Sequence, residues 1–574
     1  MRLICEEPGG LGNPGRRGLF WGGVLSGLCA VLTACIFLFW RAVPFQVSQF
    51  DDAYMFLRYA HNFLEGHGIR WNVQDPATYG ISSLLYLFQI IALLKTVPLP
   101  DPQLLVFASF FDGLAALIVI TETVCRHAFS GWMRKRYLVG PLVAVPLLMA
   151  PSFRYQLFTG MDTMLSVLTN AALVWALLAV FKKPALRRAL VLGIISYLSI
   201  LCRPDNLVYA VLSPVLFITG LVPKDRARLL AAWGLSLGLL LSIDSVVKFA
   251  VFGYIIPLPI YTKQPNFYPN FYGLLKLNPF TLFLSYLVTI LPFLIPGLLS
   301  LRRSNLGFFA VFFAPQLLTA VILCYGVQIM GMNGRFYFPG LPFAVTGSFL
   351  LLDDFLVRGT EQNIRESFKI RGLIAALILL MMPAGLRESH IRVKEFWRTY
   401  LGPRYDTNFP NYVSRNRLKR ASWWELLQAV HEILKRAPAG ISFAASEHGY
   451  LSSQHLGIRM IDVTGLHDAY IVRHGFSAAH ILSQKPDLIW FPHSDYIDAV
   501  GQFWDIPDFW NYYEYYPLAF EFGFAIRRTG AHYAVLKESF SRVWKEFYPD
   551  IAMESQQVSD AALMKAMLKE VSSV

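Results

Sequence analysis

The chain is poor in charged residues and in cysteine for its length. Of its 574 residues only 16% are charged, whereas 55% are hydrophobic, and this balance excludes an ordinary soluble globular protein. There are six cysteines and none follows Cys324, so the polar C-terminal part has no disulfide framework. No two cysteines stand at the C-x-x-C spacing of a structural metal site. The composition therefore indicates a membrane protein.

The excess of positive charge does not indicate a nucleic-acid-binding protein. The formal net charge is +13, but no basic stretch is interleaved with aromatic residues. In membrane proteins Lys and Arg collect in the cytoplasmic loops, and this bias accounts for the excess without a polyanionic partner.

Twelve apolar runs are long enough to be considered as membrane segments. The first, 19–40, has 22 uncharged residues, enough to cross a bilayer core of about 30 Å, and we interpret it as a retained anchor. The basic clusters between the runs all fall on one side only if 81–97 does not cross. That run is short and is followed by prolines, so we expect a helix lying against the outer face. The remaining runs are 103–125, 137–151, 161–181, 189–202, 206–222, 229–252, 279–300, 306–326, 337–357 and 372–386.

We therefore predict a polytopic α-helical membrane protein with about eleven spans, a cytoplasmic N-terminus and an extracytoplasmic C-terminus. On this topology the loops that combine acidic, basic and turn-forming residues all lie outside, which is the arrangement expected of a catalytic face. A transporter would instead place ionisable residues near the membrane midplane within repeated halves, and no inverted repeat is evident. The outer loops are 41–102, 152–160, 203–205, 253–278 and 327–336.

The composition changes at about residue 387, where charged and aromatic residues mix and no further span follows. We divide the chain into a transmembrane domain, 1–386, and a small extracytoplasmic α/β domain, 387–574. An amphipathic helix is expected at 421–437, and a closing hairpin is expected from 522–528 and 532–537. Buried strands are expected at 441–446, 458–463 and 487–491.

Several short motifs follow one another along the chain. The first outer loop contains DDAY, RYA-x-N and GHG, starting at Asp51, and ends in a G-I-S-S turn at 80–83. Later members are Gly160-Met161-Asp162-Thr163, Arg203-Pro204-Asp205, Pro257 with Tyr261 and Lys263, Arg335-Phe336-Tyr337-Phe338-Pro339, and Glu447-His448-Gly449-Tyr450 followed by 461–466.

This ordered set, covering about residues 20–470, resembles the outer loops of GT-C membrane glycosyltransferases. Within that superfamily the motifs most resemble those of the terminal β-(1→2)-arabinofuranosyltransferase and related bacterial polyprenyl-phosphate-sugar-dependent enzymes. The resemblance implies arabinofuranose as the sugar. Three departures from the family pattern are Ser83 in place of proline, Asp162 where glutamate is commoner, and Leu258-Pro259 in place of Asn-Thr, and the last two lie in donor-side motifs.

The resemblance implies inverting transfer of a sugar from a polyprenyl-phosphate donor to a glycan, lipid or protein acceptor at the outer face of a bacterial inner membrane. Such a reaction needs a base for the acceptor hydroxyl and cations for the departing phosphate. We expect Asp51 to be the base, with Asp52 orienting it or contacting a sugar hydroxyl. The donor-side candidates are Arg58, Asp162, Arg203, Asp205, Lys263 and Arg335, and the acceptor-side candidates are Glu447, His448 and His467.

Each of these residues also has a structural interpretation. Asp52 or Asp162 can cap a helix, and Arg203 can pair with Asp205. Arg58 can pair with an acid, and the acceptor-side residues can belong to a solvated loop or a packed domain. No metal-ligand spacing is evident, although an acidic pair is able to recruit Mg²⁺ or Mn²⁺.

Two other functions fit the same sequence. The first is transfer of another lipid-linked sugar, such as mannose, by the same fold. The second is transport or flipping of a lipid-linked saccharide, in which the outer domain binds and does not react.

Overall fold

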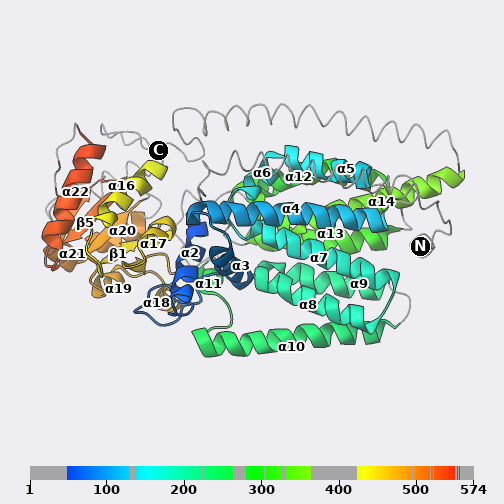
Figure 1. The fold of residues 1–574 in the computed structure, drawn as a ribbon, viewed down its shortest axis with the longest axis horizontal. Helices are drawn as coiled ribbons and strands as arrows, with labels where there is room; N and C mark the ends of the chain where they lie inside the picture. Colours follow the sequence, from blue (N-terminus) through cyan, green and yellow to red (C-terminus); the bar gives the residue numbers. More distant parts are fainter. Residues whose placement is uncertain are drawn as a thin grey trace.

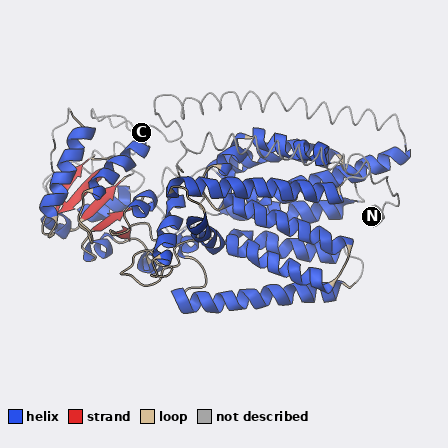
Figure 2. Ribbon diagram, viewed as in Figure 1, coloured by secondary structure: helices blue, strands red, loops and turns tan. Residues whose placement is uncertain are grey.

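A computed structural model shows a bundle of long helices with a mixed α/β domain at one end (Figures 1 and 2). It describes residues 50–128, 136–221, 225–262, 279–302, 305–325, 331–362, 423–492 and 497–549 except Leu518 and Glu521, together with Ser48, Gln328, Met553 and Ser555. The predicted spans 19–40 and 372–386, the domain boundary at 386 and Lys263 lie outside these residues.

Six helices in the described part are long and apolar enough to cross a membrane. Shorter helices complete the bundle: α5 (Arg136–Met149), α6 (Pro151–Leu157), α8 (Leu186–Cys202) and α9 (Ser213–Leu221). The long helices are α4 (Asp101–His127), α7 (Thr163–Lys182), α10 (Arg226–Phe252), α12 (Pro279–Leu299), α13 (Leu306–Tyr325) and α14 (Leu341–Gln362).

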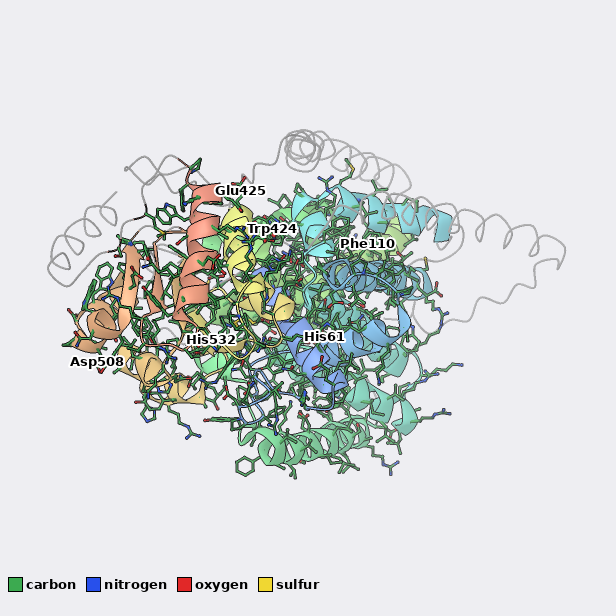
Figure 3. All side chains as sticks on the ribbon, turned by 60° about the vertical axis from the view of Figure 1, so that its left-hand side comes forward. His61, Phe110, Trp424, Glu425, Asp508 and His532 are labelled. Atoms are coloured by element: carbon green, nitrogen blue, oxygen red, sulfur yellow. The ribbon has the colours of Figure 1, made fainter. Side chains whose placement is uncertain are left out.

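The predicted non-crossing segment forms α3 (Leu84–Thr96). Its 13 residues extend about 20 Å, which is less than the hydrocarbon thickness. It packs against α2 (Asp51–Leu64), the helix that carries the acidic pair. Figure 3, in which His61 of α2 is labelled, shows α2 between the α/β domain and the bundle.

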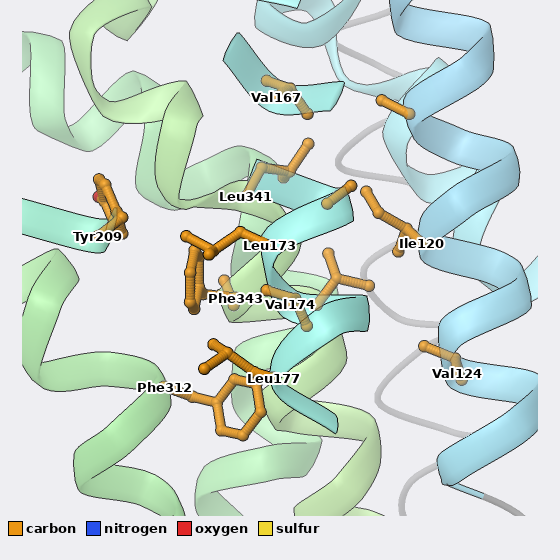
Figure 4. Close-up of a cluster of buried hydrophobic side chains, with 14 of the residues drawn as sticks. Ile120, Val124, Val167, Leu173, Val174, Leu177, Tyr209, Phe312, Leu341 and Phe343 are labelled. Atoms are coloured by element: carbon orange, nitrogen blue, oxygen red, sulfur yellow. The ribbon is translucent and has the colours of Figure 1, made fainter. Parts of the chain in front are cut away.

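The centre of the bundle is filled by apolar side chains from helices that are distant in sequence (Figure 4). Ile120 of α4, Leu177 of α7, Phe312 of α13 and Phe343 of α14 are all buried in one cluster. Because lipid tails are as apolar as these side chains, close packing and not the hydrophobic effect holds such helices together.

The α/β domain is built on one five-stranded sheet with the order β2-β1-β3-β5-β4. Strands β1, β2 and β3 run parallel, and β5 pairs antiparallel with both β3 and β4. The strands are β1 (Ser442–Ala445), β2 (Arg459–Asp462), β3 (Leu488–Phe491), β4 (Tyr513–Pro517) and β5 (Gly523–Arg527). The helices are α16 (Trp423–Lys435), α17 (Gly449–Gln454), α18 (Ala469–His474), α19 (Ala478–Ser483), α20 (Ile497–Trp504), α21 (Pro507–Tyr512) and α22 (Tyr533–Phe547).

The three predicted buried strands and the amphipathic helix are confirmed, and the structure shows that these strands are parallel, but the closing hairpin is wrong. Residues 532–537 do not form a strand, because α22 begins at Tyr533. The apolar residues there continue with helical spacing through Leu536, Phe540 and Val543, all of which are buried. The antiparallel partner of β5 is instead the preceding strand β4.

Candidate active site between the bundle and the α/β domain

Three buried charged side chains meet where α7, α8 and the 3₁₀ helix η7 (Met332–Gly340) converge. Asp162 Oδ1 accepts from Arg203 Nη1 at 3.2 Å and from Arg335 Nη2 at 2.9 Å. The exposed fractions are 1% for Asp162, 4% for Arg203 and 5% for Arg335. The three predicted donor-side residues that the structure brings together are therefore removed from bulk solvent.

The backbone around Arg335 is shaped by the preceding Asn333 and Gly334. Both adopt left-handed conformations, with φ of 53° and 73°. A Cβ on Gly334 would lie 2.6 Å from the carbonyl oxygen of Leu282, so only glycine fits there. This tight turn explains why an Asn-Gly pair precedes the arginine that reaches Asp162.

The charges in this cluster balance. Arg203 also forms a two-point ion pair with Asp205, through Nε to Oδ1 at 3.0 Å and Nη2 to Oδ2 at 2.8 Å. Burial alone would lower the pKa of Arg203, but the carboxylates of Asp205 and Asp162 outweigh it and hold that pKa above its usual value. Two cations thus face two carboxylates in a site of low dielectric constant.

Aromatic rings line the same cluster and connect it to the acidic pair. The guanidinium carbons of Arg203 and Arg335 lie 5.2 and 5.5 Å from the ring centroid of Phe336. Arg335 is also 5.6 Å from the ring of Phe50, which directly precedes Asp51. Phe50 therefore places the start of the helix that carries the acidic pair next to Arg335.

Asp51 joins the helical bundle to the α/β domain. Its Oδ2 and Oδ1 accept from the backbone N–H groups of Gly449 and Tyr450, each at 2.7 Å. A Cβ on Gly449 would lie 2.0 Å from the carbonyl oxygen of Asp51, so the two backbones touch. Burial raises the pKa of Asp51, and the two N–H groups oppose that rise only in part.

Asp52 has a more open environment. It is half-buried, and its side chain makes no hydrogen bond to any described residue. Helix α2 starts at Asp51 with Phe50 at its N-cap position, so Asp52 is not the cap and both acids occupy the first turn. Negative charge at that position is favourable to the helix dipole.

Arg58 uses every donor it has within the protein. Nε donates to Trp71 O, and the two Nη groups donate to the carbonyls of Ser452, His455 and Ile458 and to Asn72 Oδ1. These five bonds account for all five N–H groups of a guanidinium, which leaves none for a phosphate. Arg58 therefore joins α2 to the α/β domain through carbonyl and amide oxygens, and the expected pairing with an acid is not found among the described residues.

The acceptor-side histidines lie together at the carboxyl ends of two parallel strands. His448 follows β1, and Asp462 ends β2, where it pairs in register with Ala445. His467 Nδ1 is 3.0 Å from Tyr59 Oη, and its ring stacks on Trp71 with centroids 3.8 Å apart. Asp462 was not predicted as a partner of these histidines, although it stands in the Ile-Asp-Val-Thr motif. The third acceptor-side candidate, Glu447, is half-buried.

A cleft of about 510 Å³ opens beside this histidine pair, between the first outer loop and the α/β domain. Its lining includes Asp75, Tyr79, Tyr254, Arg459, Asp462 and Tyr470. A lining that contains both aromatic rings and charged groups suits a ligand rich in hydroxyls, because rings cover its apolar faces and carboxylates accept from its hydroxyls.

Two further features were not predicted. Asn170 and Asn206 form a buried network with Ser199 and the carbonyl of Pro339, tying α7, α8 and η7 together beneath the arginines. The sequence feature that could have revealed this network is an asparagine within an apolar run. Arg154 of α6 is half-buried, and its Nε is buried with no partner among the described residues.

No protein-family model and no curated protein matches this chain. Among solved structures, the chain is similar to the crystal structure of ArnT from Cupriavidus metallidurans bound to undecaprenyl phosphate. The TM-score is 0.50 at 12% sequence identity, and the match covers 83% of this chain and 91% of that chain. The chain therefore shares the overall fold of that structure, a bundle of long apolar helices with a small C-terminal sheet domain.

Proposed function

We propose that this protein is an inverting glycosyltransferase that moves a sugar from a polyprenyl-phosphate donor to an acceptor at the outer face of the membrane. The observation that carries the proposal is the convergence of Asp51 and the buried pair Arg203 and Arg335 at one end of the bundle. The fold shared with ArnT supports the same class of reaction. The sequence motifs favour arabinofuranose as the sugar and an envelope glycan, lipid or protein as the acceptor.

The arginines would stabilise the departing lipid phosphate. As the anomeric carbon–oxygen bond breaks, charge develops on a phosphate that lacks the chelating diphosphate of a nucleotide sugar. Donors fixed in a buried site stabilise such charge strongly, because they need little reorganisation. Arg335 retains an Nε that is buried and without a described partner, so it has capacity for a phosphate oxygen. Lys263, from the same motif set, is proposed on sequence alone.

Asp51 would accept the proton of the attacking hydroxyl while the new bond forms between that oxygen and the anomeric carbon. A carboxyl group whose pKa is raised by burial is a stronger base than an exposed one. Each oxygen of Asp51 accepts one N–H, which leaves lone pairs for a substrate proton. Asp52, being more open, would contact a sugar hydroxyl.

The acceptor would approach from the cleft beside His467. Glu447, His448 and His467 are proposed to border its path. The mixture of rings and carboxylates in the cleft favours a saccharide acceptor over an apolar one.

The proposal is tested by transfer of radiolabelled sugar from polyprenyl-phosphate-arabinose and from polyprenyl-phosphate-mannose, using membranes that carry the wild type or Asp51→Asn. We expect transfer from one donor, most simply the arabinose donor, and a loss of at least about 100-fold in the variant. Transfer from the mannose donor would keep the reaction class and correct the sugar.

Asp51 also docks the α/β domain, so a matched control is needed. Gly449→Ala disturbs the same contact and leaves the carboxylate in place. If Asp51 is only a docking residue, the two variants will lose activity equally and share one pH profile. Movement of lipid-linked saccharide across the membrane without a new glycosidic bond would instead establish the transporter.

A further inference from the structure

His448, Asp462 and His467 form a cluster that the proposed reaction does not use for chemistry. A ring nitrogen of each histidine and a carboxylate oxygen of Asp462 all lie within 4.8 Å of one another. The exposed fractions are 1%, 3% and 8% for His448, Asp462 and His467. Three side chains of the types that bind metal ions are therefore close together and buried.

In both histidines one ring nitrogen has a protein partner and the other has none. His448 Nδ1 is 3.3 Å from the carbonyl oxygen of Ala445, and His467 Nδ1 is 3.0 Å from Tyr59 Oη. Nε2 of each ring is buried without a hydrogen-bond partner among the described residues. An imidazole held at one nitrogen by a carbonyl or hydroxyl, with the other left open, is the usual environment of a metal-binding histidine.

The carboxylate of Asp462 is oriented in a similar way. Oδ1 accepts from the backbone N–H and the hydroxyl of Thr464, each at 2.7 Å, and Oδ2 accepts from the backbone N–H of His467 at 2.5 Å. Within the described chain, the only cationic group that lies within 4.0 Å of it is His448, at 3.9 Å, and that ring is charged only if protonated. A buried carboxylate without a close permanent cation favours a bound cation.

We propose that His448, Asp462 and His467 bind one transition-metal ion of the zinc class. Two imidazoles and one carboxylate are a common ligand set for zinc that keeps a fourth position open. Ligands of a tetrahedral zinc ion are roughly 3.4 Å apart, so each of the three atoms would move inward by less than about 1 Å. Harder ions such as Mg²⁺ prefer oxygen ligands and fit this set poorly.

The ion would act at the contact between the α/β domain and the first outer loop. All three ligands come from the α/β domain, while Tyr59 and Trp71 of the first outer loop hold the ring of His467. Asp462 and His467 also line the cleft, which gives an ion a path to the site and gives its open position access to a ligand hydroxyl.

The test measures metal directly, so it does not depend on the proposed transferase activity. The full-length protein, purified in detergent, is dialysed against micromolar zinc and then metal-free buffer, and its zinc is measured by mass spectrometry. We expect about one zinc per wild-type chain and less than about a tenth of that in His448→Ala/His467→Ala. The matched control is His431→Ala/His455→Ala, which removes a second close histidine pair of the same domain and is expected to retain the zinc.

A variant that fails to fold would also lose zinc. Cobalt binding to the wild type therefore provides a second measurement that does not depend on the variant. Chelator-treated wild type titrated with Co²⁺ should give the visible absorption bands of a tetrahedral nitrogen and oxygen site, and zinc should displace them. Wild type that retains no zinc and shows no such bands would overturn the proposal. Equal zinc content in the wild type and the His448→Ala/His467→Ala variant would also overturn it.

Discussion

At the scale of single residues, Asp162 is the carboxylate that pairs with both buried arginines of the site. It is 1% exposed, and one of its oxygens accepts from both Arg203 and Arg335. Asp162→Asn preserves the size of the side chain but leaves two buried guanidinium groups with one carboxylate. We expect a loss of about 3 kcal/mol of stability, measured as a lower denaturation midpoint in detergent.

Asp205→Asn is the control for this prediction. Asp205 also pairs with Arg203, but its side chain is 29% exposed, so water compensates for part of the lost charge. The effect of Asp205→Asn should be smaller. Equal midpoints for Asp162→Asn and the wild type would show that Asp162 does not hold the arginines in place.

His61 of α2 gives a pH-dependent prediction. Its Nε2 is 2.5 Å from Asp101 Oδ2, and this hydrogen bond raises the pKa of His61 above its ordinary 6.5. Because the folded-state pKa is the higher one, the pair contributes its full stability below the unfolded pKa and loses it as pH rises through the folded pKa. His61→Gln should cost up to about 1 kcal/mol near about pH 6 and almost nothing near about pH 9.

The denaturation midpoint measured at both pH values checks this prediction. His67→Gln is the control, because the His67–Glu65 pair is 3.9 Å apart and its side chains are 42% and 53% exposed. A deficit of the His61 variant that is the same at both pH values would mean that packing, and not the ion pair, stabilises this position.

The charged residues of the site could be predicted from the sequence, but the groups that they contact could not. The motifs at Asp51, Asp162, Arg203 and Arg335 could be found because acidic, basic and turn-forming residues occur together in the predicted outer loops, whereas the inner loops are mainly basic. The contact between Asp51 and the backbone of Gly449 could not, because it joins distant parts of the chain and uses main-chain groups that carry no sequence signal.

At the scale of elements, the contact between α2 and α17 fixes how the α/β domain sits on the bundle. Gly449→Ala would place a Cβ 2.0 Å from the carbonyl oxygen of Asp51, and neither backbone has room to move away cheaply. We expect at least about 2 kcal/mol of destabilisation and faster proteolysis between the two parts. Gly457→Ala is the control, because a Cβ there meets nothing within 4 Å. Identical proteolysis of the two variants would contradict the contact.

The predictions for elements succeeded where a short apolar run stands alone between turn signals, and failed where such a run is the first part of a longer helix. The parallel strands were found because each is a short buried run between turn signals, and α3 because it is too short to cross. The hairpin failed because residues 533–536 form a short apolar run that fits a strand as well as a helix, and the helical spacing becomes evident only over the full 15 residues of α22.

At the scale of the whole molecule, the distribution of basic residues predicts an orientation that labelling can check. Lys183 and Gly457 are both exposed and lie in opposite parts of the molecule, at the end of α7 and in the α/β domain. In a cysteine-free background, Gly457→Cys should react with a membrane-impermeant maleimide in intact cells. Lys183→Cys should react only after permeabilisation. The reverse pattern would place the α/β domain inside.

The proposed reaction requires the buried arginines next to Phe50 to bind the phosphate of a polyprenyl lipid. The most direct measurement is the affinity of the purified protein for undecaprenyl phosphate in lipid nanodiscs, compared between the wild type, Arg335→Gln and Arg228→Gln. Arg228 is the control, because its side chain is 80% exposed at the start of α10, distant from the site. We expect at least about tenfold weaker binding for Arg335→Gln and no change for Arg228→Gln. Wild-type affinity in a folded Arg335→Gln variant would contradict it.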